Sequence, residues 1–198
     1  MPRAERERLI LEVAGQVFAR DGYHSASMEE IAQLADVSKP MLYAYFGSKE
    51  GLYVAYVDRI GRQLVERLQS AGRHEDAIRV RLISRIDEFL AFVEEHRDGW
   101  TVLFREAAAS TPVAEQVAEL RAQIAGTVRR MILSSLPEGF SLSPHASDGI
   151  ANATVGAGEA LANWWLANRD VPREEVVRWY AGLVQAAVMA GAQPERAA

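Results

Sequence analysis

The sequence predicts an all-α protein, and three observations lead to that fold class. Apolar residues recur at spacings of three and four in most segments, which is the period of a helix with one buried face. No stretch alternates apolar and polar residues between turn signals, as a half-buried strand does. No proline occurs between Leu52 and Pro112, so long helices can form there.

The N-terminal segment predicts one amphipathic helix over residues 4–20. Its apolar stripe consists of Leu9, Ile10, Val13, Ala14, Val17 and Phe18. Asp21 and Gly22 follow this stripe, and a glycine can adopt the positive φ that often ends a helix.

Serine caps in residues 27–53 predict two further short helices and the start of a longer one. Ser27 and Glu30 fit a capping box, in which the hydroxyl accepts from the Glu30 N–H while the carboxylate reaches back. Ser38 can cap the second short helix, with Pro40 in the first turn, where a missing N–H costs little. The longer helix begins at Lys49, after Gly47 and Ser48.

Two short helices joined by a tight turn predict a helix-turn-helix motif. Such helices bury too little surface alone, so the helix over 4–20 must pack across them, with Val17 and Phe18 as partners. The residues expected to face inward are Ile31, Leu34, Val37, Leu42 and Phe46. This arrangement leaves one face of the second short helix free to enter a DNA major groove.

Beyond residue 60 the pattern stays helical. An apolar stripe over 82–93 predicts one helix, and two more are expected at about 147–168 and 173–191. Prolines and glycine predict a loop over 134–146.

Composition excludes several classes of protein. The 198 residues contain 22 Lys+Arg and 27 Asp+Glu, for a net charge of 22 − 27 = −5, and no cysteine. Disulfides and thiolate chemistry are therefore excluded, and no uninterrupted apolar run reaches the roughly 18 residues of a membrane span. The four histidines are scattered, and no catalytic motif occurs. We expect a cytoplasmic protein that is not an enzyme, with no metal and no cofactor.

The most specific stretch of the chain contains Ile31-Ala32, then Val37-Ser38-Lys39, then Leu42-Tyr43-Ala44-Tyr45-Phe46-Gly47-Ser48-Lys49-Glu50-Gly51-Leu52. This run resembles the DNA-binding domain of the TetR family of bacterial transcriptional regulators, and the resemblance covers residues 5–56. It implies a DNA-binding domain over 1–48 and an effector-binding and dimerisation domain, a helical bundle, over 49–198. The implied partners are double-stranded DNA, a small-molecule effector and a second copy of the chain.

The resemblance also implies which residues contact DNA, with a recognition helix at about 38–46. Positions aimed at base edges correspond to Lys39, Pro40 and Met41, and positions that contact phosphate correspond to Ser27, Tyr43, Tyr45 and Lys49. Lysine and hydroxyl groups suit phosphate, and apolar side chains suit the thymine methyl group. Pro40 and Met41 replace the glycine and small residue that are frequent in the family, so base preference does not carry over.

Charge makes this DNA-binding domain unusual. Residues 1–60 contain seven basic and nine acidic residues, for a net charge of 7 − 9 = −2. Both lysines of the chain, Lys39 and Lys49, nevertheless fall within the motif. We expect few phosphate contacts for each subunit.

Small residues in the predicted helix over 147–168 indicate close approach of another helix, since glycine costs up to about 1 kcal/mol in a helix. Together with the last helix they predict a dimer interface, although a tight crossing within one chain explains them too. The residues expected at this interface are Gly149, Ala153, Gly156, Ala157, Ala160, Trp179, Leu183, Val184 and Ala187.

Aromatic residues predict an apolar effector pocket, with Arg105 or Glu106 as polar anchors. The residues expected to line it are Phe89, Phe92, Trp100, Phe104 and Trp164, although such a set also suits a plain core. The resulting hypothesis is a ligand-responsive dimeric regulator, a repressor released from a near-palindromic operator by a small apolar or aromatic molecule. The alternative is a helical small-molecule sensor or carrier whose DNA binding has lapsed.

Overall fold

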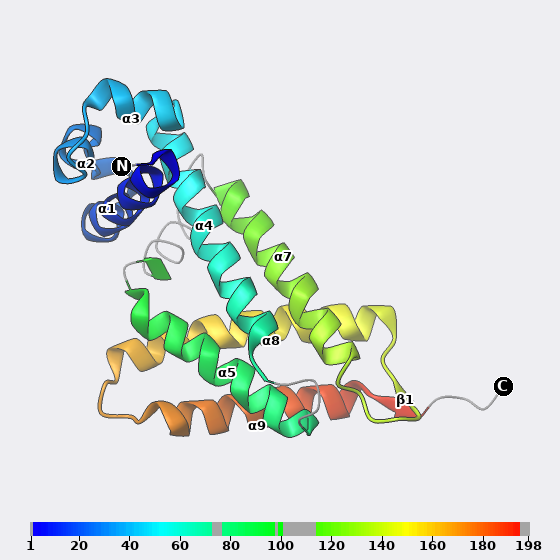
Figure 1. Cartoon of the computed structure of the whole chain (residues 1–198). Coiled ribbons are helices and arrows are strands. Elements are labelled where there is room, and N and C mark those ends of the chain that lie inside the picture. The colour runs from blue at the N-terminus through cyan, green and yellow to red at the C-terminus, as the bar shows by residue number, and fades with distance from the viewer. Residues whose placement is uncertain (1, 73–76, 98, 101–113, 195–198) are drawn as a thin grey trace. The chain divides into compact units, whose positions relative to one another are not determined.

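A computed structural model describes residues 2–72, 77–97, 99–100 and 114–194 (Figure 1). Helices make up nearly all of this part of the chain, which confirms the all-α fold class. The chain divides into two compact units: unit 1 is Met1–Gln63 with His96–Leu120, and unit 2 is Leu64–Glu95 with Arg121–Ala198. The predicted domain boundary at 48/49 concerns function and stays a prediction.

Unit 1 is built on α1 (Arg3–Ser25), α2 (Met28–Leu34), α3 (Lys39–Phe46) and the first part of α4 (Lys49–Ser70). Helix α2 packs against both α1 and α3, which forms the predicted three-helix arrangement. The buried side chains at its centre include Ile10, Val17, Phe18, Ile31, Leu42, Leu52 and Tyr53. The Phe18 and Tyr53 rings meet edge to face, with centroids 5.1 Å apart, so α4 shares the core of α1.

Helix α1 is interrupted where the sequence predicts its end. Gly22 has φ 75° and ψ 168°, which breaks the helical geometry before the last turn. A side chain at this position is strained, so glycine fits the break.

The prediction that Leu34 faces inward is wrong. Its side chain is 56% exposed, at the last residue of α2, whereas Ile31 and Ala32 are fully buried. A seven-residue helix makes only two turns, so one buried stripe has room for few side chains and Leu34 falls outside it.

Unit 2 contains α5 (Ile78–Glu95), the larger part of α7 (Ala114–Leu133), α8 (Pro144–Ala167) and α9 (Arg173–Gly191). Helix α9, the orange to red helix at the bottom of Figure 1, packs against both α5 and α8. Leu90 and Val93 of α5, Ala162 of α8 and Val176 of α9 are completely buried.

A short strand pair was not expected. Strands β1 (Phe140–Ser141) and β2 (Gln193–Pro194) pair antiparallel, so the predicted loop over 134–146 contains one strand. Two residues are too few to produce an alternating pattern in the sequence.

Helix α8 begins three residues earlier than predicted, because Ser143 caps it and Pro144 occupies its first turn. The Ala146 N–H donates to Ser143 Oγ at 3.1 Å. Across the described residues, every helix falls short of the length and apolarity that a membrane span requires.

Candidate functional site

Three serine caps fix the geometry of the helix-turn-helix. Ser27 Oγ accepts from the Glu30 N–H at 3.4 Å, Ser38 Oγ from the Met41 N–H at 3.3 Å, and Ser48 Oγ from the Gly51 N–H at 2.9 Å. All three caps were predicted from the sequence. They satisfy N–H groups that have no partner within their own helices.

The second half of the predicted capping box differs from the expectation. The Glu30 carboxylate, which the capping box directs to the Ser27 N–H, accepts a hydrogen bond from Arg20 at 2.8 Å. Arg20 also binds Asp21, so this guanidinium joins the end of α1 to α2. The two carboxylates raise the pKa of Arg20, and its charge lowers the pKa of Asp21.

Two residues with positive φ make the turns on either side of α3. Asp36, with φ 53°, adopts the left-handed conformation between α2 and α3. Gly47, with φ 74°, ends α3. Aspartate tolerates this conformation better than most residues.

The residues predicted to contact bases remain accessible on α3. Lys39 and Pro40 are exposed, and Met41 is half-buried. Tyr43, one turn further on, is 42% exposed. The buried side of the helix is held by Leu42, so the outer side is available to a partner.

The two tyrosines of α3 have different surroundings. Tyr45 is half-buried, with its ring centroid 6.0 Å from that of Phe46 and with the Arg3 guanidinium 5.2 Å above it. Tyr43 is the more exposed of the two tyrosines. The two side chains differ because residues two apart on a helix point in different directions.

Lys39 is paired with an acidic residue of α2. Its Nζ lies 3.0 Å from Glu29 Oε2, and both side chains are largely exposed. The hydrogen bond and charge of Glu29 raise the pKa of Lys39. The pairing of Glu29 with Lys39 was not predicted from the sequence. The available signal was an acidic residue in the first turn of α2, ten residues before Lys39.

Lys49 holds the end of α1 against the start of α4. Its Nζ donates to the His24 carbonyl at 2.7 Å and lies 5.1 Å from the centre of the Tyr23 ring. The predicted phosphate contact of Lys49 is untested, and the geometry gives the side chain a structural role as well.

The predicted dimer residues lie mostly on the surface of unit 2. Six of them are exposed: Gly149, Ala153, Gly156, Ala160, Trp179 and Leu183. Ala157 and Ala187 are half-buried, while Val184 is buried within the chain itself. A Cβ added at Gly149 or Gly156 meets no atom within 4 Å, so packing among the described residues does not explain these glycines.

The described members of the predicted pocket belong to both units, and the prediction of a shared pocket stays a prediction. Trp164 is 44% exposed and its ring centroid lies 6.2 Å from that of Trp179, among the predicted dimer residues. Phe89 and Phe92 lie on α5 in unit 2, and the buried Trp100 belongs to unit 1. Phe104, Arg105 and Glu106 fall outside the described residues.

Unit 2 also contains a half-buried polar cluster that the sequence did not reveal. Arg121 donates to both oxygens of Glu159, at 2.9 and 3.0 Å. Burial raises the pKa of Glu159, although the Arg121 charge opposes this effect. Nearby, the Tyr180 hydroxyl donates to the Thr154 carbonyl at 2.6 Å, and burial raises the pKa of Tyr180.

Two family models match the chain. One, described as bacterial regulatory proteins of the tetR family, matches residues 10–56, and the other, a tetracyclin repressor-like C-terminal domain, matches residues 78–189. The chain is 35% identical over 179 residues to the HTH-type transcriptional activator FasR of Mycolicibacterium smegmatis, covering 89% of this chain and 80% of that protein. It is 44% identical over 55 residues to the HTH-type transcriptional regulator RutR of Escherichia coli, covering 28% of this chain and 26% of that protein.

Solved structures give the same result. A TetR-like transcriptional regulator from Rhodococcus sp. RHA1 matches with a TM-score of 0.75 and 34% identity, over 96% of this chain and 99% of that one. A tetR-family transcriptional regulator from Streptomyces coelicolor matches with a TM-score of 0.77 and 28% identity, over 96% of this chain and 82% of that one.

Proposed function

Because the chain belongs to the TetR family of transcriptional regulators, we propose that it acts as a homodimer that binds a near-palindromic operator and responds to a small molecule. The observation that carries this proposal is the accessible side of α3, where Lys39, Pro40 and Tyr43 are exposed above a buried Leu42. Members of the family are regulators rather than enzymes.

The accessible side of α3 suits a DNA major groove. In the proposed complex Lys39 and Met41 meet base edges, since a lysine donates to guanine acceptors and an apolar side chain contacts a thymine methyl group. The hydroxyls of Ser27 and Tyr43 bind phosphates, and Tyr45 and Lys49 add contacts beside them. Phosphate contacts fix the register of the helix, so that the base contacts can select a sequence.

The accessible face of α8 and α9 supports the proposed dimer. We define the dimer face as Gly149, Ala153, Gly156, Ala160, Trp164, Trp179 and Leu183. Its glycines let another helix approach closely, and its two tryptophans supply apolar area that a partner covers. A two-fold dimer reads two inverted half-sites, whose spacing follows from the separation of its two recognition helices.

The proposed response to ligand requires two states of the dimer. An effector bound in the C-terminal domain favours the state with a different separation of recognition helices, and a typical coupling is about 1–3 kcal/mol. Helix α4 contributes residues to both units, which makes it the proposed carrier of the change.

We propose repression in the cytoplasm as the direction of control, because a dimer on an operator excludes other proteins without needing a surface to recruit them. Activation is the second candidate, and the name of the 35% identical relative, a transcriptional activator, favours it. A promoter–reporter fusion in cells with and without the protein separates the two directions of control.

A gel-shift assay tests the DNA-binding proposal against the alternative of a carrier with lapsed DNA binding. The wild-type protein is expected to shift DNA from its own upstream region at moderate salt, whereas Lys39→Ala and Tyr43→Phe weaken the shift without lowering the melting temperature. A folded dimer that shifts no DNA specifically would favour the carrier.

A further inference from the structure

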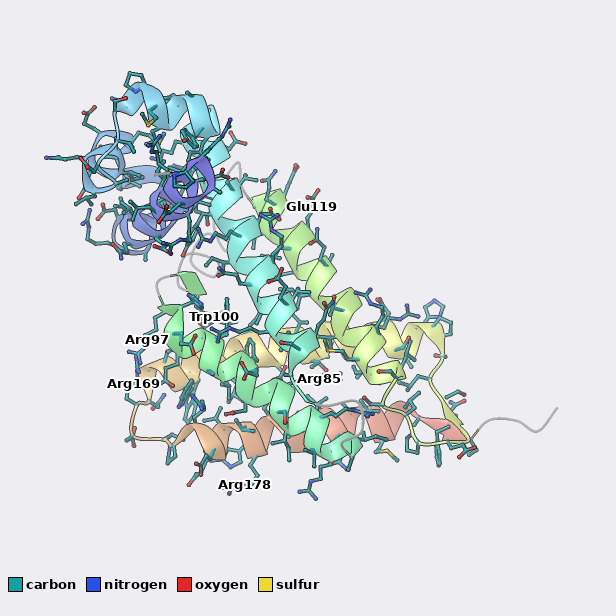
Figure 2. The ribbon with its side chains drawn as sticks, in the orientation of Figure 1. Arg85, Arg97, Trp100, Glu119, Arg169 and Arg178 are labelled. Carbon is teal, nitrogen blue, oxygen red and sulfur yellow. The ribbon has the colours of Figure 1, made fainter. Side chains whose placement is uncertain are left out.

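Arg85 of α5 is the feature of unit 2 that the fold leaves unexplained. Its side chain is half-buried, and Nε is fully buried without a hydrogen-bond partner. Burial and the neighbouring positive charge of Arg81 lower the pKa of Arg85. Arg85, labelled in Figure 2, lies near the middle of α5 in sequence. Buried N–H groups in proteins are nearly always hydrogen-bonded, so the unsatisfied Nε of this half-buried arginine calls for a partner.

Four other half-buried arginines of unit 2 have partners within the unit. Arg67 pairs with Glu95, Arg121 with Glu159, and Arg173 with both Asp87 and Glu94. Arg129 donates to the buried Ser147 hydroxyl at 2.9 Å. Unit 2 thus supplies partners for these four arginines, and among the described residues it supplies none for Arg85.

Three of the four acidic residues of α5 are already paired. Asp87 and Glu94 bind Arg173, and Glu95 binds Arg67. The fourth, Glu88, acts on the charge of Arg67. The paired carboxylates of this helix are therefore not available to Arg85, and a bound anion can take the role.

The residues beside Arg85 are aromatic. Phe89 and Phe92 follow it at i+4 and i+7, so the three residues share one face of the helix. The Phe89 ring lies 6.3 Å from the Tyr180 ring of α9, and Phe92 is fully buried. An apolar surface therefore adjoins the unpaired cation.

We propose that this face of α5 is the effector site and that its ligand is an organic oxyanion, in which a carboxylate or phosphate pairs with Arg85 while an apolar body contacts Phe89. A guanidinium presents parallel N–H groups, so two oxygens of a single anionic group can both accept, and pairing with Nε requires the side chains that cover it to move aside. The regulatory role of this ligand rests on the proposed function, whereas the binding of an anion at Arg85 does not. The assignment replaces the small apolar or aromatic effector that the sequence predicts with an amphipathic one.

Titration calorimetry with the purified full-length protein tests the proposal. The probes are octanoate, octyl phosphate and 1-octanol on an alkyl body, and 4-phenylbutyrate and 4-phenyl-1-butanol on an aryl body. Potassium phosphate alone tests for a simple ion. The variants are Arg85→Met, which removes the positive charge, and Arg85→Lys, which keeps the charge but loses the two parallel N–H groups of the guanidinium. Arg79→Met is the matched control, because Arg79 is exposed on the same helix.

At least one acid is expected to bind the wild type about tenfold or more tightly than the alcohol with the same body. Arg85→Met abolishes that difference, Arg85→Lys keeps part of it, and Arg79→Met keeps all of it. The melting temperature of Arg85→Met is not lowered, because the variant removes an unsatisfied charge. The stronger of the carboxylate and the phosphate ester identifies the head group.

Four outcomes overturn the proposal: equal binding of acid and alcohol, unchanged acid binding by Arg85→Met and Arg85→Lys, no acid bound below about 1 mM, or equal binding of inorganic phosphate alone. A gel shift of the same preparations separates this inference from the proposed function. Intact operator binding without acid binding defeats only the inference, and acid binding at Arg85 without operator binding defeats only the proposed function.

Discussion

Lys39 of α3 and Glu29 of α2 form an ion pair across the helix-turn-helix, with Nζ 3.0 Å from Oε2. The cation that we propose to meet DNA is therefore paired with an acid of the preceding helix. Both side chains are exposed, so water and salt weaken the pair. DNA binding has to break or share this contact, which makes Glu29 a competitor for the same ammonium group.

Glu29→Gln is expected to tighten operator binding about two- to fivefold, because an exposed pair contributes at most about 1 kcal/mol. Fluorescence anisotropy with a labelled operator measures the change. Glu66→Gln, an equal change of charge at an exposed position of α4, serves as the control. An equal gain from Glu29→Gln in the Lys39→Ala background would show that the effect does not pass through Lys39.

The salt dependence of operator binding is expected to be shallow. Residues 1–60 carry a net charge of 7 − 9 = −2, and Lys39 is already paired with Glu29. A plot of log K against log salt for the dimer is expected to have a slope shallower than about −8. A steeper slope means that the protein releases more counterions than this charge pattern allows.

Local signals in the sequence predicted the helix-turn-helix well. Ser27, Ser38 and Ser48 act within three residues of their partners, so their caps can be read from neighbouring residues. The prediction that Leu34 is buried was wrong, because the helical period alone does not show which side of a two-turn helix packs against a neighbour.

Contacts between distant residues could not be predicted in the same way. Lys49 and its acceptor His24 are 25 positions apart, and the pair forms because α1 and α4 meet in the folded unit. The apolar stripe of α5 predicted that Phe89 and Phe92 share a face of the helix. A pattern of apolar residues does not show whether an arginine on that face has a partner. Only the folded chain shows that Arg85 is left unpaired.

Gly51→Ala is expected to destabilise unit 1 by about 1–3 kcal/mol. A Cβ at this position overlaps the carbonyl oxygen of Phe46, which is backbone and cannot move aside. Gly126→Ala is the control, because its Cβ meets only the end of Arg130 at 3.8 Å. That variant is expected to gain up to about 1 kcal/mol from helix propensity. Thermal melting of both variants, followed by circular dichroism, distinguishes the two effects.

Leu183→Arg is expected to convert the dimer to a monomer without unfolding it. Leu183 is 58% exposed within one chain, so the arginine costs little until a partner covers it. Light scattering after size exclusion measures the mass, and Gln185→Arg, exposed on the same helix outside the dimer face, is the control. If Leu183→Arg stays dimeric, the interface lies elsewhere.

Selection of binding sites from random duplex DNA with the full-length protein tests the central claim most directly, that two copies of α3 read DNA together. The expected result is an enriched motif of two inverted half-sites, bound tightly by the wild type and weakly by Lys39→Ala. Enrichment of no motif, or of a single half-site that Lys39→Ala binds equally well, would contradict the claim.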